Sequence, residues 1–81
     1  MIHARKDYDR FQDPAGLIPE DEPVFLLRGQ DIVAPVVVVV WADLAEAEGA
    51  NQTIIGHARE HAELMRTWQK EHGSKIPDMP S

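Results

Sequence analysis

The hydrophobic positions of this chain concentrate in two stretches, residues 31–48 and residues 52–72. The first contains five consecutive valines, Val36 to Val40, which favour a strand by intrinsic propensity. The second places apolar residues at the spacing of one face of a helix, with charged residues between them. We predict a helix for each stretch, because helix boundary signals flank both.

Three boundary features predict the first helix over residues 31–48. Asp31 is a good N-cap, and Pro35 falls in the first turn, where its missing N–H removes no intrahelical hydrogen bond. Gly49 is a plausible stop after a run of helix formers. A strand over residues 36–41 stays as the alternative. The helix would group its apolar side chains on one face, formed by Ile32, Val36, Val40 and Leu44 and flanked by Val37 and Trp41.

The second helix is expected over residues 52–72, with Asn51 or Thr53 as its cap and Gly73 as its end. Its apolar seam consists of Ile54, Ala58, His61, Met65 and Trp68. The opposite face carries Arg59, Glu60, Glu63, Arg66, Gln69 and Lys70. Because residues three apart are neighbours on a helix, Glu63 and Arg66 are expected to form an ion pair.

The remaining residues carry turn and extended signals. Residues 1–12 form an arm, and residues 13–30, which contain three prolines and the turn sequence DPAG, form an extended linker. Within this linker residues 24–28 are either a strand or a buried extended segment. The tail, residues 73–81, is extended or disordered. The predicted fold is therefore a single all-α domain over residues 1–81: arm, linker and an antiparallel two-helix hairpin.

The composition indicates that this domain assembles with partners. A chain of 81 residues buries only a modest core, and the absence of cysteine excludes disulfides and thiolate metal sites. The valine run is apolar on every side, so one neighbouring helix cannot cover it. We expect a homo-oligomer in which a second chain packs on the outside.

The charge changes the range of partners. A formal net charge of −6 disfavours long nucleic acid, which is bound through many Lys and Arg contacts. The longest apolar run is too short to cross a bilayer, so no membrane partner and a cytoplasmic location are expected. One local patch, residues 3–10, surrounds Tyr8 with basic residues that include Arg10. There Tyr8 either stacks on a base beside a phosphate-binding arginine or pins the arm onto the hairpin.

A histidine motif raises the question of catalysis. His57, Glu60 and His61 spell H-x-x-E-H, the inverted zinc-peptidase signature, and two histidines one turn apart can bind a metal together. A catalytic zinc also needs a third protein ligand and an open cleft. We interpret the motif as a coincidence in a helix rich in His and Glu, and expect no metal, no cofactor and no catalytic residue. The prediction is a protein that is not an enzyme.

The layout PEDEPVFLLR followed by two amphipathic helices, with a tyrosine-bearing arm before it, resembles the small phage anti-CBASS sponge proteins. The resemblance covers about residues 5–70 in arrangement. It implies a homohexamer that sequesters cyclic di- or trinucleotide signals without cleaving them. For a phage-encoded protein, the location would be the host cytoplasm.

The resemblance also implies site residues. Tyr8 would stack on a base, and Arg28 would contact a phosphate. Leu26 stands where the family pattern leads us to expect a lysine. The ligand-binding candidates are Tyr8, Arg10, Phe25, Arg28, Arg59 and Arg66.

Two functions follow. The first is sequestration of cyclic oligonucleotides, with Arg59 and Arg66 serving a further anionic site at a subunit junction. The alternative is an oligomeric protein–protein interaction module with no small-molecule ligand. In that case Arg59 and Arg66 belong to a solvated helix face.

Overall fold

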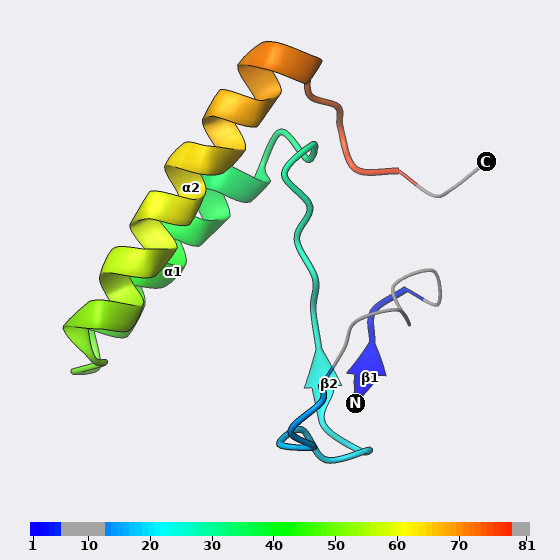
Figure 1. Ribbon diagram of the computed structural model, residues 1–81, viewed down its shortest axis with the longest axis vertical. Helices are drawn as coiled ribbons and strands as arrows, with labels where there is room; N and C mark the ends of the chain where they lie inside the picture. Colours follow the sequence, from blue (N-terminus) through cyan, green and yellow to red (C-terminus); the bar gives the residue numbers. More distant parts are fainter. Residues whose placement is uncertain (6–12, 79–81) are drawn as a thin grey trace.

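The computed structural model describes residues 1–5 and 13–78. In chain order its elements are strand β1 (Ile2–His3), strand β2 (Pro23–Val24), helix α1 (Ala34–Ala47) and helix α2 (Gln52–His72). The two helices pack side by side as a hairpin, which forms one limb of the molecule, and the strands lie in a second limb (Figure 1). The predicted two-helix hairpin is confirmed, and Val36 to Val40 are helical rather than a strand.

Helix α1 begins later than the sequence indicated. Its N-cap is Val33, which makes no side-chain capping bond, whereas Asp31 forms a turn just before it by accepting a hydrogen bond at Oδ1 from the Val33 N–H (2.9 Å). The prediction of Asp31 as the N-cap was therefore wrong. Pro35 lies in the first turn as expected. The helix stops before Gly49, whose φ of +83° is a conformation that glycine adopts without strain.

Helix α2 begins at a side-chain cap. Asn51 Oδ1 accepts from the backbone N–H groups of Thr53 (2.8 Å) and Ile54 (3.4 Å), so Asn51, rather than Thr53, is the cap. At the other end Gly73 adopts a φ of +88° and donates its N–H to the carbonyl of Gln69 (2.7 Å). The predicted ends of this helix are confirmed.

Small side chains form the interface between the helices. The fully buried positions of the hairpin are Ala34, Pro35, Ala42, Ile55 and Ala62, and Met65 is almost fully buried. Alanine lets two helix backbones approach closely, and the close contact excludes water from the interface.

The apolar side chains of α1 share one face, as predicted, whereas the seam predicted for α2 is in the wrong register. The α1 face formed by Ile32, Val36, Val40 and Leu44, with Val37 and Trp41, remains largely exposed on the side away from α2. On α2 the predicted seam keeps Met65, whereas Ile54 is largely exposed and Ile55 is buried in its place. The alanines of both helices form the contact.

A short strand pair makes the all-α class incomplete. β1 and β2 are parallel, with Ile2 opposite Pro23 and His3 opposite Val24. The Ile2 N–H donates to the carbonyl of Glu22 (2.8 Å). Pro23 has no N–H, which limits the ladder and suits a two-stranded pair without further neighbours.

The linker is fixed to both α2 and the tail. The side-chain amide of Gln69 donates to the carbonyls of Gly29 (2.8 Å) and Asp31 (3.0 Å). The backbone of Lys75 exchanges hydrogen bonds with Gln30 and Ile32, both at 2.9 Å. The tail as far as residue 78 is therefore extended and runs beside residues 30–32.

Candidate functional site

One hollow formed by described residues lies where the linker passes α2. Its volume is about 290 Å³, and its walls come from two elements: residues 27–30 of the linker and one face of α2. The lining residues are Leu27, Arg28, Gly29, Gln30, His61, Leu64, Met65 and Trp68. The hydrogen bonds from Gln69 to Gly29 and Asp31 hold the linker against the helix and so fix these walls.

Arg28 supplies the positive charge of this hollow. Its side chain is exposed, and it makes no ion pair with any described residue. An arginine without a carboxylate partner keeps its planar fork of donors for an external anion. Arg28 was a predicted phosphate contact, and its position in the hollow is compatible with that role.

Trp68 supplies an aromatic surface in the same hollow. Its ring stacks on the ring of His72, with centroids 4.4 Å apart and planes inclined by 18°. His72 Nδ1 lies 3.1 Å from the carbonyl oxygen of Trp68, which restrains the histidine ring. Sequence reasoning had assigned Trp68 to the apolar seam and so missed it as a site residue. Gln69, the residue after Trp68, contacts the linker at Gly29 and Asp31, which lie forty and thirty-eight residues away in the sequence. No local sequence pattern reveals such contacts.

Arg59 and Arg66 do not line this hollow. Arg59 donates to Asp43 (3.0 Å) and approaches Glu46 (3.5 Å), and the hydrogen bond to Asp43, followed by that to Glu46, raises the pKa of Arg59. Arg66 pairs with Glu63 at 2.6 Å, as predicted. Each of these two guanidinium groups already has a carboxylate partner, so an anionic ligand would have to compete with it.

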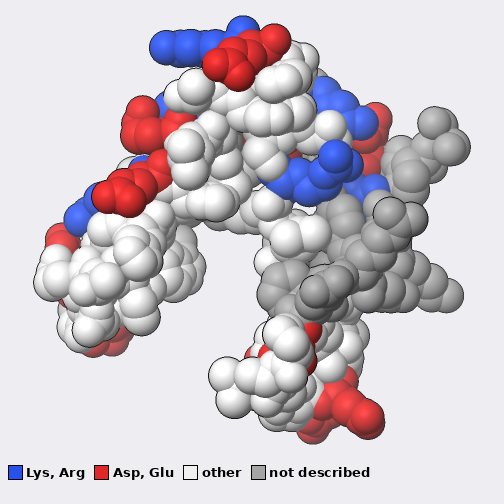
Figure 2. Space-filling view, viewed as in Figure 1, with Lys and Arg blue, Asp and Glu red and all other residues white. Residues whose placement is uncertain are grey.

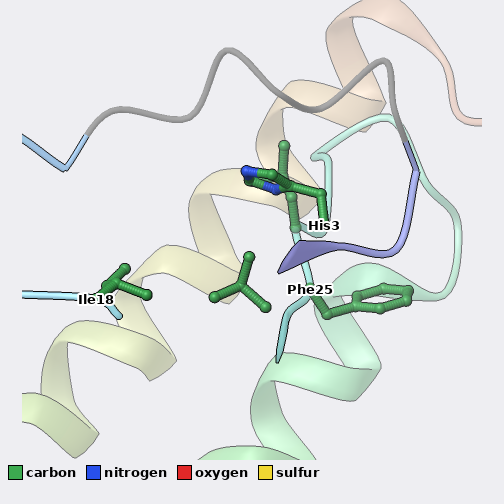
Figure 3. Close-up of a pocket in the computed structure, with 5 residues that line it drawn as sticks. His3, Ile18 and Phe25 are labelled. Carbon is green, nitrogen blue, oxygen red and sulfur yellow. The ribbon is translucent and has the colours of Figure 1, made fainter. Parts of the chain in front are cut away.

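Phe25 lies at a second, smaller pocket in the strand limb. This pocket of about 90 Å³ is lined by His3, Ile18, Val24, Phe25 and Leu26. The Phe25 side chain is 73% exposed, and Figure 3 shows its ring directed away from Ile18. The predicted binding residues Phe25 and Arg28 therefore line different hollows.

Two further predicted site residues, Tyr8 and Arg10, lie outside the described residues.

The histidines of the H-x-x-E-H motif lie on the exposed part of α2. His57 and His61 are one turn apart, and His61 lines the hollow. Within residues 1–5 and 13–78, no group of three His, Asp or Glu side chains converges on a common point where a metal ion could sit. The pair therefore has no third ligand among these residues.

The two limbs differ in charge. Figure 2 shows acidic side chains at the tip of the strand limb, basic side chains at the junction between the limbs, and both kinds along the hairpin. The tip is the segment Glu20, Asp21 and Glu22, all exposed. An anion approaching the molecule is therefore attracted to the junction and repelled by the tip.

Comparison with known proteins gives no relative. No family model matches the chain, and neither a curated protein nor a solved structure is similar to it. Among the described residues no helix is both long and apolar enough to cross a membrane. What can be defined is a class: a small helical hairpin with a short parallel strand pair.

Proposed function

We propose that this chain is a non-catalytic binding protein that sequesters a small anionic ligand carrying planar bases, with cyclic di- and trinucleotides as the ligand class. The observation that supports it best is the hollow in which Arg28, free of ion pairs to described residues, and Trp68 occur together. The ligand class comes from the resemblance of PEDEPVFLLR and the flanking elements to the anti-CBASS sponge proteins.

The chemistry of the hollow suits such a ligand. A guanidinium group contacts a phosphate bidentately, and an indole face stacks on a base with a gain of about 1–3 kcal/mol. Gly29 adds an open stretch of backbone, since a Cβ at this position would meet only the side chain of Met65 at 3.8 Å. The volume of about 290 Å³ accommodates one base with its phosphate. A cyclic ligand would extend beyond the hollow, toward the arm or a second subunit.

The net charge of −6 limits the ligand to a few phosphates. A compact anion needs only one or two local cations, whereas a long polyanion would meet the acidic tip of the strand limb and the carboxylates of the hairpin. Arg59 and Arg66 would join the site only by exchanging their carboxylate partners for phosphate.

Calorimetric titration with cyclic di- and trinucleotides, and with linear dinucleotides for comparison, tests the proposal. We expect saturable binding of an intact cyclic ligand, with loss of at least tenfold in affinity in Arg28→Ala and Trp68→Ala. Lys70→Ala is the matched control, because Lys70 also makes no ion pair with described residues but does not line the hollow.

The titration also bears on the arm. If Tyr8 stacks on a base, Tyr8→Ala weakens binding and leaves the assembly intact. No heat with any ligand, or equal weakening by Arg28→Ala and Lys70→Ala, would overturn the proposed site.

The second candidate is a protein interaction module without a small ligand. It is supported by the exposed apolar face of α1, which is larger than a small monomer ordinarily leaves in water. A protein that binds no nucleotide but loses its assembly when this face is changed would favour it.

A further inference from the structure

The exposed face of α1 is continuous and apolar, with the exposed carboxylate of Asp43 at its edge near the C-terminal end. It consists of Ile32, Val33, Val36, Val37, Val40, Trp41 and Leu44, whose exposed fractions lie between 43% and 64%. Residues recurring every three or four positions form one stripe along a helix of about 3.6 residues per turn. The buried positions Ala34 and Ala42 point toward α2, so the stripe lies on the opposite side of α1. Figure 1 shows α1 partly behind α2.

The total surface of the chain is large for its mass, because the two limbs leave much of each other uncovered as well as the α1 stripe. The chain exposes 6405 Å², whereas a compact monomer of this mass exposes about 4,900 Å². Its radius of gyration is 14.1 Å, against about 12 Å for a compact domain of 81 residues. The excess of roughly 1,500 Å² is more than one partner contributes to a standard interface, about 800 Å².

We propose that the α1 stripe is a homodimer interface, in which a second copy of this chain packs its own α1 antiparallel across a twofold axis. An isologous interface requires one surface that complements itself. A neutral stripe of valines meets this requirement, and the β-branched side chains lose little rotamer freedom when they are buried. The seven side chains offer roughly 600 Å² per chain, close to the size of a standard interface.

The charges beside the stripe select the antiparallel arrangement. The charged residues of α1 and its C-cap are Asp43, Glu46 and Glu48, all in the C-terminal third, where Arg59 of α2 pairs with the first two. At the other end the only acidic residue is Asp31, which precedes the first turn. A parallel pair would bring these acidic ends together. An antiparallel pair places each acidic end beside the N-terminus of the other α1, where the helix dipole favours negative charge.

This inference does not depend on the proposed ligand. Sedimentation equilibrium of the full chain and of Val40→Glu tests it, with Ile76→Glu as the control, because Ile76 is exposed but lies in the tail. We expect the assembly mass to fall twofold in Val40→Glu and to stay unchanged in Ile76→Glu. Far-ultraviolet circular dichroism of the same samples shows that the helices persist. A monomeric parent chain, or an assembly that Val40→Glu leaves intact, would overturn the interface.

Cross-linking tests the orientation. The chain has no cysteine, so single Val33→Cys and Leu44→Cys variants can be mixed and oxidised. Val33 and Leu44 lie at opposite ends of the stripe, about 16 Å apart along the helix axis. The antiparallel dimer gives mixed disulfides between the two variants, whereas like-with-like disulfides would overturn the antiparallel arrangement.

Discussion

The neighbouring isoleucines Ile54 and Ile55 distinguish the observed helix packing from the packing that the sequence predicted. Ile55 is fully buried against α1, whereas Ile54 is 54% exposed. Both are isoleucine, both lie in the first turn of α2, and replacement by alanine changes helix propensity equally. The two variants therefore differ in burial and in little else.

The expected costs follow from that burial. Ile55→Ala removes three buried carbon atoms, worth about 2.4 kcal/mol in transfer, and leaves a cavity, so we expect a loss of about 3 kcal/mol. Ile54 is only partly buried, so Ile54→Ala loses less than half of this transfer free energy. It leaves no cavity because water reaches the site, and the higher helix propensity of alanine offsets part of the loss. Its expected loss is about 0.5–1 kcal/mol.

Urea unfolding monitored by circular dichroism measures this difference. With a urea dependence of about 1 kcal/mol per molar for so small a domain, the two midpoints should differ by about 2 M. The measurement belongs at a low protein concentration, so that association does not contribute to stability. If Ile54→Ala costs as much as Ile55→Ala, the buried register described here is wrong, and the seam with Ile54 facing inward is correct.

The remaining predictions concern the caps and the tail. Asn51→Ala removes the side-chain cap of α2 and should cost about 1 kcal/mol in thermal unfolding. Gly49→Ala should destabilise the fold by about 1 kcal/mol, because alanine is strained at a φ of +83°. Gly56 lies within α2 and has open space where a Cβ would be, so Gly56→Ala should stabilise by up to about 1 kcal/mol. Equal shifts of the two melting temperatures would contradict this expectation. The hydrogen bond from Lys75 lowers the pKa of Asp78, so the ion pair is present above the ordinary carboxyl pKa and is lost as the pH falls through the lowered pKa. In an NMR titration the Asp78 signals should therefore move at lower pH in the parent chain than in Lys75→Ala.

The ends of α2 could be predicted from the sequence because they depend on local chemistry, whereas the predicted N-cap of α1, Asp31, was wrong. Asn51 caps by accepting from backbone groups two and three residues away, and Gly73 ends a helix by its own φ. Pro35 fits only a first turn, which explains why the helical interpretation of the valines was correct.

The buried face of each helix could not be predicted in the same way. Hydrophobicity identifies apolar residues. It does not show whether a face of large side chains or a face of small side chains packs against the neighbouring helix when both faces are apolar. On α1 the face with Ala34 and Ala42 packs against α2, because the backbone of α2 can approach these small side chains closely. The valines on the opposite face remain exposed. The sequence therefore indicated that part of an all-round apolar helix would stay uncovered by its neighbour, but not which part.

The candidate site was predictable only in part. Arg28 was a candidate through the resemblance to the sponge proteins, whereas Trp68 lines the same hollow through contacts that join residues far apart in sequence. The β1–β2 pair could not be predicted either. Each strand has only two residues, which is too short for an alternating pattern, and a long connection separates the strands in sequence.

The sequence separations within the fold have a consequence for the order of folding. The hairpin closes over a short connection, and its Arg59–Asp43 pair joins residues 16 positions apart. The bond from Arg5 to the carbonyl of Asp78 joins residues 73 positions apart and unites the two ends of the chain. Closing the longer loop costs about 1.3 kcal/mol more in chain entropy than closing the shorter one. We therefore expect the hairpin to form first and the ends to join last, so that in native-state hydrogen exchange the amides of Ile2 and Lys75 open well before those of α2.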